Sequence, residues 1–236
     1  MKKILAFVAV AVTAVAMASA DPLLVGHGYF GVGLGSTVTD HTPPAATLSG
    51  AEKTWNFGSN LDFGAGIGVN IPFGGNFGIQ PGVDFYVNNL GYHAKYTLLS
   101  QTWEQDFTFS YMSLDIPILF TIKINKFNFA VGPYFSIPVG DASIVATNGA
   151  LNGDKTAFLA SHSNFDNKYS NRTGFNFGAT LGIGYEQRLG MGMLVFGGRY
   201  MHDFLPIEVK DGENNVVKFW RGALAIDVGY KIPLSF

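Results

Sequence analysis

The last thirteen residues of the chain alternate strictly between two kinds of side chain. One set is apolar and ends on an aromatic residue: Leu224, Ile226, Val228, Tyr230, Ile232, Leu234 and Phe236. The other set is small, polar or charged: Ala225, Asp227, Gly229, Lys231, Pro233 and Ser235. Successive side chains of a β-strand point to opposite faces, so this period of two predicts a strand with one apolar and one polar face.

The same period recurs in seven earlier segments. It marks residues 24–34, 61–73, 77–87, 112–122, 127–137, 175–186 and 194–200, the first of them only weakly. With 224–236 these segments predict eight strands, an even number, as single-chain bacterial barrels have. Short connections at 72–76, 124–126 and 188–191 alternate with long polar ones around 37–55, 89–105, 138–172 and 203–216. The parity slips by one around 107–112, which predicts a β-bulge there.

Composition indicates that the apolar faces meet lipid. Charged residues make up 14% of the chain, against about 25% in a soluble domain. Residues 21–236 contain no apolar run of about 20 residues, which excludes helical spans. Only helices and closed barrels satisfy every backbone group in lipid. A soluble barrel would bury its apolar faces, but the opposite faces here carry Gly, Asp, Arg, Asn and Thr, which are too small and too hydrated for a dry core.

We therefore predict an all-β fold: an eight-stranded antiparallel transmembrane β-barrel of up-and-down topology, with short periplasmic turns and long extracellular loops. Residues 1–20 are predicted to be a cleaved signal peptide, because Lys2 and Lys3 precede an apolar stretch that ends in small residues. Residues 21–236 would then form the barrel domain. Without the two lysines the chain has 13 basic and 17 acidic residues. This excess of acidic residues argues against nucleic-acid binding. The absence of Cys excludes disulfides and thiolate metal sites.

Charged side chains gather on the predicted inner face. They are Asp62, Asp84, Asp115, Glu186, Arg199, Arg221, Asp227 and Lys231. An eight-stranded barrel has an interior just wide enough for side chains to fill, and inward glycines leave room for long ones. We expect Arg199 or Arg221 to pair with Asp227, Glu186 or Asp115. The charges would form either an ion-paired plug or a narrow, gated polar path for small solutes.

The amino-acid sequences of two segments resemble those of a known family. Residues 111–120 (YMSLDIPILF) and 132–135 (GPYF) resemble strands of the PorT-type family of porin-like outer-membrane proteins, and the architecture is similar to that of OmpX and OmpW proteins. The resemblance implies an eight-stranded barrel, with a secretion role in one branch, and no functional residue carries over. The final strand resembles the signal by which such barrels are inserted, which implies that the insertion machinery reads Tyr230, Ile232, Leu234 and Phe236.

Other motifs support no chemistry. Residues 26–31 match G-x-G-x-x-G, but no helix pattern follows, so a nucleotide site is not expected. His162 and Ser163 are adjacent and would point to opposite faces of a strand, which argues against an esterase pair. His41, His93, His162 and His202 are scattered and indicate no metal site. We predict no catalytic residue, no cofactor and no metal.

The long segment 138–172 is the predicted place for recognition, because loops on a rigid scaffold commonly carry function. Phe158, Phe165 and Tyr169 are its candidate contacts, although the loop could equally be a solvated tether. The sequence favours a non-enzymatic barrel with a closed lumen, acting in membrane integrity or in surface binding through its loops. The alternatives are a narrow channel for small or apolar solutes and an accessory component of secretion. The expected partners are outer-membrane lipid, the insertion machinery and an unidentified extracellular or periplasmic protein.

Overall fold

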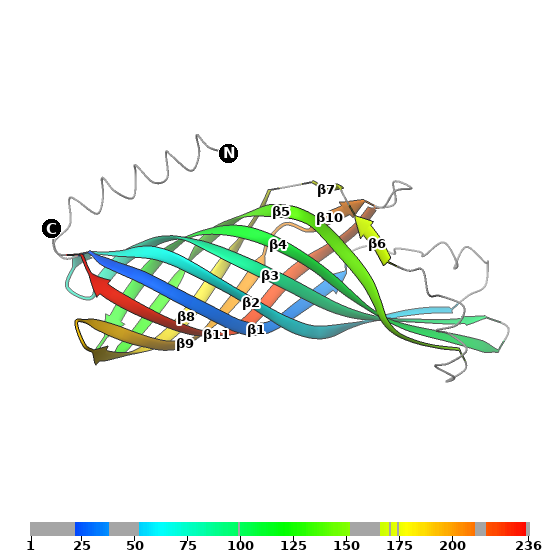
Figure 1. Ribbon diagram of the computed structural model, residues 1–236, viewed down its shortest axis with the longest axis horizontal. Coiled ribbons are helices and arrows are strands. Elements are labelled where there is room, and N and C mark those ends of the chain that lie inside the picture. The colour runs from blue at the N-terminus through cyan, green and yellow to red at the C-terminus, as the bar shows by residue number, and fades with distance from the viewer. Residues whose placement is uncertain are drawn as a thin grey trace.

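A computed structural model describes residues 22–37, 52–98, 100–151, 166–169, 171–173, 175–210 and 216–234. Eight long strands form the wall of a barrel (Figure 1): β1 (Leu23–Thr37), β2 (Glu52–Gly74), β3 (Phe77–Leu98), β4 (Gln101–Ile124), β5 (Phe127–Leu151), β8 (Asn176–Leu189), β9 (Gly192–Asp203) and β11 (Val216–Pro233). Three short strands lie at one end: β6 (Asp166–Tyr169), β7 (Asn171–Thr173) and β10 (Ile207–Lys210). No helix within the described ranges is both long and apolar enough to span a membrane.

The wall is antiparallel and closed. Each wall strand pairs with the next along the chain, and β1 pairs with β11 from Leu23 opposite Pro233 to Thr37 opposite Phe219. The short strands are additions, since β6 pairs with β5 and β10 pairs with β11 and β7. Closure removes the unpaired edges that lipid would not tolerate. The predicted eight-stranded antiparallel transmembrane barrel is confirmed.

The two faces of the wall lie as the alternation predicted. Ile226 is 62% exposed on the outer face, whereas Arg221 on the same strand is 1% exposed. Apolar side chains cover the outside and polar ones lie within. Ile71 and Ile116 belong to the apolar alternation of the segments 61–73 and 112–122, which predicts them on the outer face, but both are buried. The register of β2 against β3 shifts between Pro72 and Gly74, directly after Ile71.

Three short turns join the strands at one end of the barrel, which we call the turn side. They lie at residues 75–76, 125–126 and 190–191, within the short connections predicted. Gly75, Asn125 and Gly190 adopt positive φ angles of 54°, 56° and 61° there. Such angles suit glycine and asparagine in tight hairpin turns. The opposite end, from which the long connections start, is called the loop side.

Two predicted loops are wrong in part, and one of them is 138–172, because β5 continues through residues 138–151. The segment 89–105 is mostly strand, because β3 and β4 extend to a tight connection around Ser100. Two contacts link the strands there: His93 Nδ1 lies 2.6 Å from Asp106 Oδ1 in a hydrogen bond, and Lys95 Nζ forms an ion pair with Glu104 Oε1 at 3.0 Å. In Figure 1 the ends of β2 to β5 project beyond the rest of the wall. A strand outside lipid needs no apolar outer face, so the hydrophobic alternation does not mark it.

The bulge lies at the expected level, but on another strand. Two register shifts separate β4 from β5, between Asp106 and Phe107 and between Ser110 and Met112. The extra residues belong to β5, since β4 pairs with β3 without a shift over the same stretch. Phe109 and Tyr111 therefore keep the parity of the inner face and are buried.

Candidate functional site

The interior of the barrel holds two buried arginines at different levels. Arg199 projects from β9 and Arg221 from β11, and each reaches carboxylates on strands across the lumen. A guanidinium has five donors in a fixed fork, so it can bind several acceptors at once. Each arginine organises its own group of polar side chains.

The Arg199 cluster comprises Arg199, Asp84, Asp227, His27 and Tyr29. Arg199 Nη1 lies 3.2 Å from Asp84 Oδ2 and donates to the Tyr29 hydroxyl at 3.1 Å. Arg199 Nη2 lies 2.7 Å from Asp227 Oδ2. The guanidinium carbon also stands 4.4 Å from the centroid of the Tyr29 ring. These contacts tie β1, β3, β9 and β11 together across the lumen.

His27 completes this cluster as a hydrogen-bonding partner of the arginine. Its Nδ1 lies 3.3 Å from Arg199 Nη2, and its Nε2 lies 3.0 Å from Asp84 Oδ1 and 2.9 Å from the Tyr29 hydroxyl. Because a guanidinium can only donate, Nδ1 accepts and the ring proton resides on Nε2.

The Arg221 cluster lies closer to the loop side. Arg221 Nη2 lies 2.9 Å from Asp115 Oδ2, and Nη1 donates to Asn88 Oδ1 at 2.9 Å and to Ser113 Oγ at 3.4 Å. Asn88 Nδ2 in turn donates to Ser113 Oγ at 3.1 Å. All four residues are buried. Two polar atoms of this group, Asp115 Oδ1 and Arg221 Nε, have no hydrogen-bond partner among the described residues.

Asp203 is the second carboxylate of the Arg221 cluster. Its Oδ1 lies 3.5 Å from Arg221 Nε and accepts a hydrogen bond from the Tyr134 hydroxyl. Its Oδ2 accepts from Asn176 Nδ2 at 2.8 Å. Each arginine therefore faces two aspartates, which leaves one formal negative charge in each cluster.

A buried layer of rings and small side chains connects the two clusters and shares Tyr29 with the first of them. It consists of Tyr29, Tyr86, Tyr134, Met201, Ala223 and Ala225, all buried. The Tyr29 and Tyr86 rings stack with centroids 4.9 Å apart, and Arg221 lies 5.6 Å from the Tyr86 centroid and 5.3 Å from the Tyr134 centroid. We call the two clusters with this tyrosine layer the interior plug. Packed rings and paired charges thus occupy the described interior at these two levels.

A third ion-paired group lies near the turn side. Glu186 Oε1 lies 2.7 Å from Lys231 Nζ, and its Oε2 lies 2.6 Å from Lys123 Nζ. Lys231 is buried, whereas Lys123 is partly exposed. Two cations thus share one carboxylate, so this group carries a formal positive charge.

Glycines make room for the plug at two places. A Cβ added at Gly66 would lie 2.0 Å from Asp84 Oδ1 and 2.7 Å from His27 Nε2. One added at Gly178 would lie 2.5 Å from the Tyr134 hydroxyl. Contacts this short cannot be relieved without moving the buried groups, so both positions need glycine.

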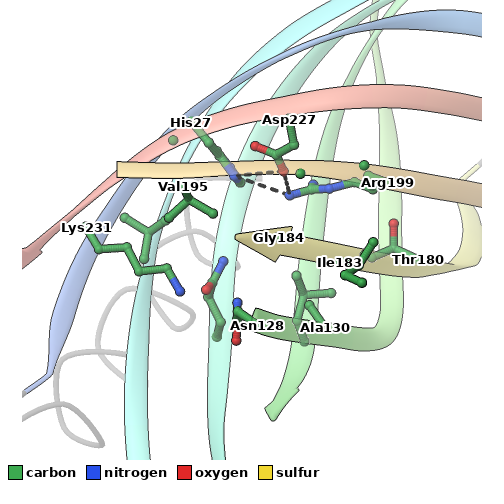
Figure 2. A pocket seen from close by; sticks show the side chains of 17 residues that line it. His27, Asn128, Ala130, Thr180, Ile183, Gly184, Val195, Arg199, Asp227 and Lys231 are labelled. Atoms are coloured by element: carbon green, nitrogen blue, oxygen red, sulfur yellow. Dashed lines mark hydrogen bonds and ion pairs between the residues drawn. The ribbon is translucent and has the colours of Figure 1, made fainter. Parts of the chain in front are cut away.

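A small cavity of about 50 Å³ lies between the Arg199 cluster and the turn-side group (Figure 2). Polar side chains reach it from His27, Asn128, Thr180, Asp227 and Lys231, and Gly184 and Ala130 form part of its wall. About 10–15 Å³ of such space holds one water. The cavity therefore suits a few waters rather than a larger solute.

Asp62 stands apart from the other predicted lumen charges. Within the described residues it forms no ion pair, and its Oδ1 accepts from the backbone N–H of Asn89 at 2.6 Å. Asn89 Nδ2 donates to the carbonyl of Leu61 at 2.6 Å. The register of β2 against β3 shifts between Ser59 and Phe63. Asp62 thus satisfies a backbone donor beside an irregular stretch of sheet.

The remaining candidates lie elsewhere. The Tyr230 hydroxyl donates to the carbonyl of Leu189 at 2.6 Å, and the Leu234 N–H donates to the carbonyl of Pro22 at 2.8 Å. Ile232 pairs with Leu24 in the closing seam. Tyr169 is in β6, opposite Ala142 of β5. Phe158, Phe165, Phe236 and residues 1–20 fall outside the described residues, so the signal peptide stays a prediction.

Sequence reasoning missed several members of the plug. His27, Tyr29, Tyr134 and Asp203 were not assigned to it, and Lys123 was not assigned to the turn-side group. His27 and Tyr29 share the inner parity of β1, but the glycines around them weaken the alternation that would have placed them. Asp203 has the parity of Arg199, although it falls where a loop was expected. Within the described ranges, no group of three or more His, Asp or Glu side chains is placed to hold a metal ion.

Three solved structures of outer-membrane proteins are among those similar to this chain. Neisserial surface protein A is 16% identical, with a TM-score of 0.42 over 88% of this chain and 95% of that one. OprG from Pseudomonas aeruginosa is 14% identical, with a TM-score of 0.39 over 91% and 97%. Ail of Yersinia pestis is 13% identical, with a TM-score of 0.37 over 90% and 99%.

No curated protein matches the chain. A family model does match, and it covers residues 27–207, from the His27 position in β1 to the start of β10. This range contains most of the barrel wall. The chain therefore belongs to the outer membrane protein beta-barrel domain family and is a bacterial outer-membrane protein.

Proposed function

We propose that this protein is a non-enzymatic outer-membrane barrel with a closed lumen, which acts in membrane integrity or in surface binding through its extracellular side. The observation that carries the proposal is the interior plug. Arg199 and Arg221 both bind carboxylates across the lumen, and the tyrosine layer fills the space between them. A solute would have to separate two sets of buried ion pairs to pass.

Breaking such pairs is energetically costly. Removing one partner of a buried ion pair destabilises a protein by about 3–5 kcal/mol, because a charge is left without compensation. The plug contains two such sets in series, at the levels of Arg199 and Arg221. This supports a structural role for the charges at neutral pH.

The loop side is the proposed place of recognition. The ends of β2 to β5 project beyond the rest of the wall (Figure 1), and loops on a rigid scaffold commonly carry function. Phe158, Phe165 and Tyr169 remain the candidate contacts for an extracellular partner. We further propose that residues 1–20 direct export and that the insertion machinery reads the strand ending at Phe236.

The second candidate function is a narrow channel for small or apolar solutes. The cavity beside Arg199 favours it, because a space large enough for a few waters lies in the turn-side half of the lumen. The PorT-type resemblance adds an accessory role in secretion. A stable periplasmic partner captured with the full-length protein would support that role.

Single-channel recording in a planar bilayer tests the closed lumen. Refolded protein, checked by its heat-modifiable gel shift, is added at pH 7.5, with gramicidin as a control that the bilayer reports channels. We expect no discrete current steps from the wild type. Steps that change in Arg199→Ala or Asp227→Ala would show that the inner charges line a path, and the closed lumen would be wrong.

A further inference from the structure

The turn side of the barrel carries more basic than acidic side chains. In the described residues, Lys123, Lys126, Arg188 and Lys231 stand against Glu186, which is four positive charges against one negative charge. Glu186 is buried between Lys123 and Lys231, so its charge compensates one of those two lysines. Lys126 and Arg188 are exposed, and neither forms an ion pair within the described ranges. Unpaired positive charge is therefore accessible at this end.

Lys126 is held on the outer wall rather than over the mouth of the lumen. Its Nζ donates to Gln187 Oε1 at 3.3 Å and stands 5.6 Å from the centroid of the Tyr185 ring. Tyr185 and Gln187 are exposed, in alternation with the buried Gly184 and Glu186, so they belong to the outer face of β8. The ammonium group of Lys126 therefore faces the surroundings of the barrel.

Two further contacts fix this arrangement. The N–H of Glu186 donates to the carbonyl of Lys126 at 2.7 Å, which attaches the β4–β5 turn to the end of β8. Phe127 is opposite Tyr185 in the sheet, and the two rings pack edge to face with their centroids 5.6 Å apart. The lysine backbone and the ring beneath its ammonium group are thus both held in place.

The site lies where the apolar band of the outer wall ends. Exposed apolar side chains close to it in the chain are Ile124, Phe127, Leu189 and Met191, which are between 47% and 79% exposed. In a bilayer, acyl chains cover such a surface, and aromatic rings mark the boundary with the headgroups. Short turns of bacterial barrels face the periplasm. The ammonium group of Lys126 consequently lies at the level of the headgroups of the periplasmic leaflet.

The chemistry of the site fits an anion that is joined to acyl chains. An ammonium group has three donors, of which Gln187 accepts one, and the Gln187 amide adds N–H donors of its own. A phosphate diester supplies acceptor oxygens and one negative charge, and its acyl chains would cover Phe127 and Ile124. A zwitterionic headgroup brings its own cation, which the positive charge of the turn side repels. The charge therefore favours an anionic phospholipid.

We propose that Lys126, Gln187 and Tyr185 form a binding site for the phosphate of an anionic phospholipid, such as phosphatidylglycerol, in the periplasmic leaflet. The exposed lysine of the β3–β4 hairpin at the loop side differs, because Lys95 is paired with Glu104 at 3.0 Å. The proposed site is on the outside of the wall, so it does not depend on whether the lumen is closed.

Native mass spectrometry of the refolded protein, released from detergent micelles, measures the affinity for single lipids. With the same acyl chains, the wild type should bind phosphatidylglycerol about fivefold more tightly than phosphatidylcholine, the factor that one basic residue contributes near anionic lipid. Lys126→Gln should remove this preference, and Lys126→Arg should keep it. Lys95→Gln is the matched control, because it removes a lysine from the loop-side hairpin, and it should bind both lipids as the wild type does.

A competition experiment separates the lipid from a free phosphate ester. Glycerol 3-phosphate has the same phosphate chemistry without acyl chains, and at millimolar concentration it should not displace phosphatidylglycerol from the wild type. Displacement would overturn the lipid as the occupant. Equal affinity of the wild type for the two lipids, or an unchanged preference in Lys126→Gln, would overturn the site itself. The heat-modifiable gel shift checks that each variant is folded, so these outcomes report binding.

Discussion

At the scale of single residues, Arg221 is the side chain on which most buried charge depends. It is 1% exposed and holds Asp115 and Asp203 at 2.9 and 3.5 Å. Arg221→Met keeps much of the volume but leaves two buried carboxylates without a cation. We expect it to lower the free energy of unfolding by about 3–5 kcal/mol, measured by urea titration in vesicles at pH 7.5.

Two further variants show whether charge is the cause of that loss. Arg188→Met removes an exposed arginine near the turn side, and its effect should stay within about 0.5 kcal/mol. Combining Arg221→Met with Asp115→Asn and Asp203→Asn neutralises the whole set, and it should recover part of the stability. If Arg221→Met proved harmless by itself, the ion-paired plug would not be a stabilising element.

The sequence predicted which side chains face inward more readily than it predicted their partners. Parity along each strand placed Arg199 and Arg221 inside, and the structure brings them to Asp227 and Asp115, among the partners named in advance. Asp84 lies across the lumen from Arg199, and no local pattern gives the stagger of distant strands that brings them together. The contact with His27 depends on the same stagger, which only closure of the barrel sets.

At the scale of elements, two of the three inward glycines of strand β8, Gly178 and Gly182, have different surroundings. A Cβ at Gly178 would lie 2.2 Å from the carbonyl oxygen of His202 and 2.5 Å from the Tyr134 hydroxyl. A Cβ at Gly182 would have its nearest neighbour 3.6 Å away, at the carbonyl oxygen of Gly198. The same substitution four residues apart on one face therefore tests packing rather than strand propensity.

We expect Gly178→Ala to lower the free energy of unfolding by about 1–3 kcal/mol, as overpacking of a filled interior does. Gly182→Ala should be neutral or slightly stabilising, because alanine is favoured over glycine in strand interiors by roughly 0.5–1 kcal/mol. Both follow from urea titration in vesicles. Equal losses for the two variants would mean that the Tyr134 contact does not limit the site.

Strand length was the least predictable property of the elements. The alternation marked β3 up to residue 87, whereas the strand continues to Leu98. Within the bilayer, contact with lipid requires an apolar outer face, so the alternation of apolar and polar residues is visible in the sequence. Outside the bilayer, cross-strand pairs such as Lys95 with Glu104 stabilise the pairing of the strands. A polar strand there resembles a polar loop in sequence.

At the scale of the whole molecule, lipid explains why the fold was predictable and the role was not. Strands in a membrane must close into a barrel and turn apolar side chains outward. The alternation around Ile226 therefore predicts the architecture. Binding at the loop side obeys no such rule. It depends on which few side chains of the extracellular segments meet a partner, and alternation carries no information about that choice.

Because the outer surface contacts lipid, we expect the cost of a charged substitution there to depend on its depth in the bilayer. Ile226 is opposite Phe30 and Gly198 in the middle of the wall, whereas Met191 is in a turn at one end and is 79% exposed. Ile226→Arg should lower the free energy of unfolding in vesicles by about 2–4 kcal/mol, and Met191→Arg by about 0–1 kcal/mol. Both variants add the same charged side chain to an outer position, so their difference reports depth alone. Equal effects would show that the band around Ile226 does not occupy the centre of the bilayer.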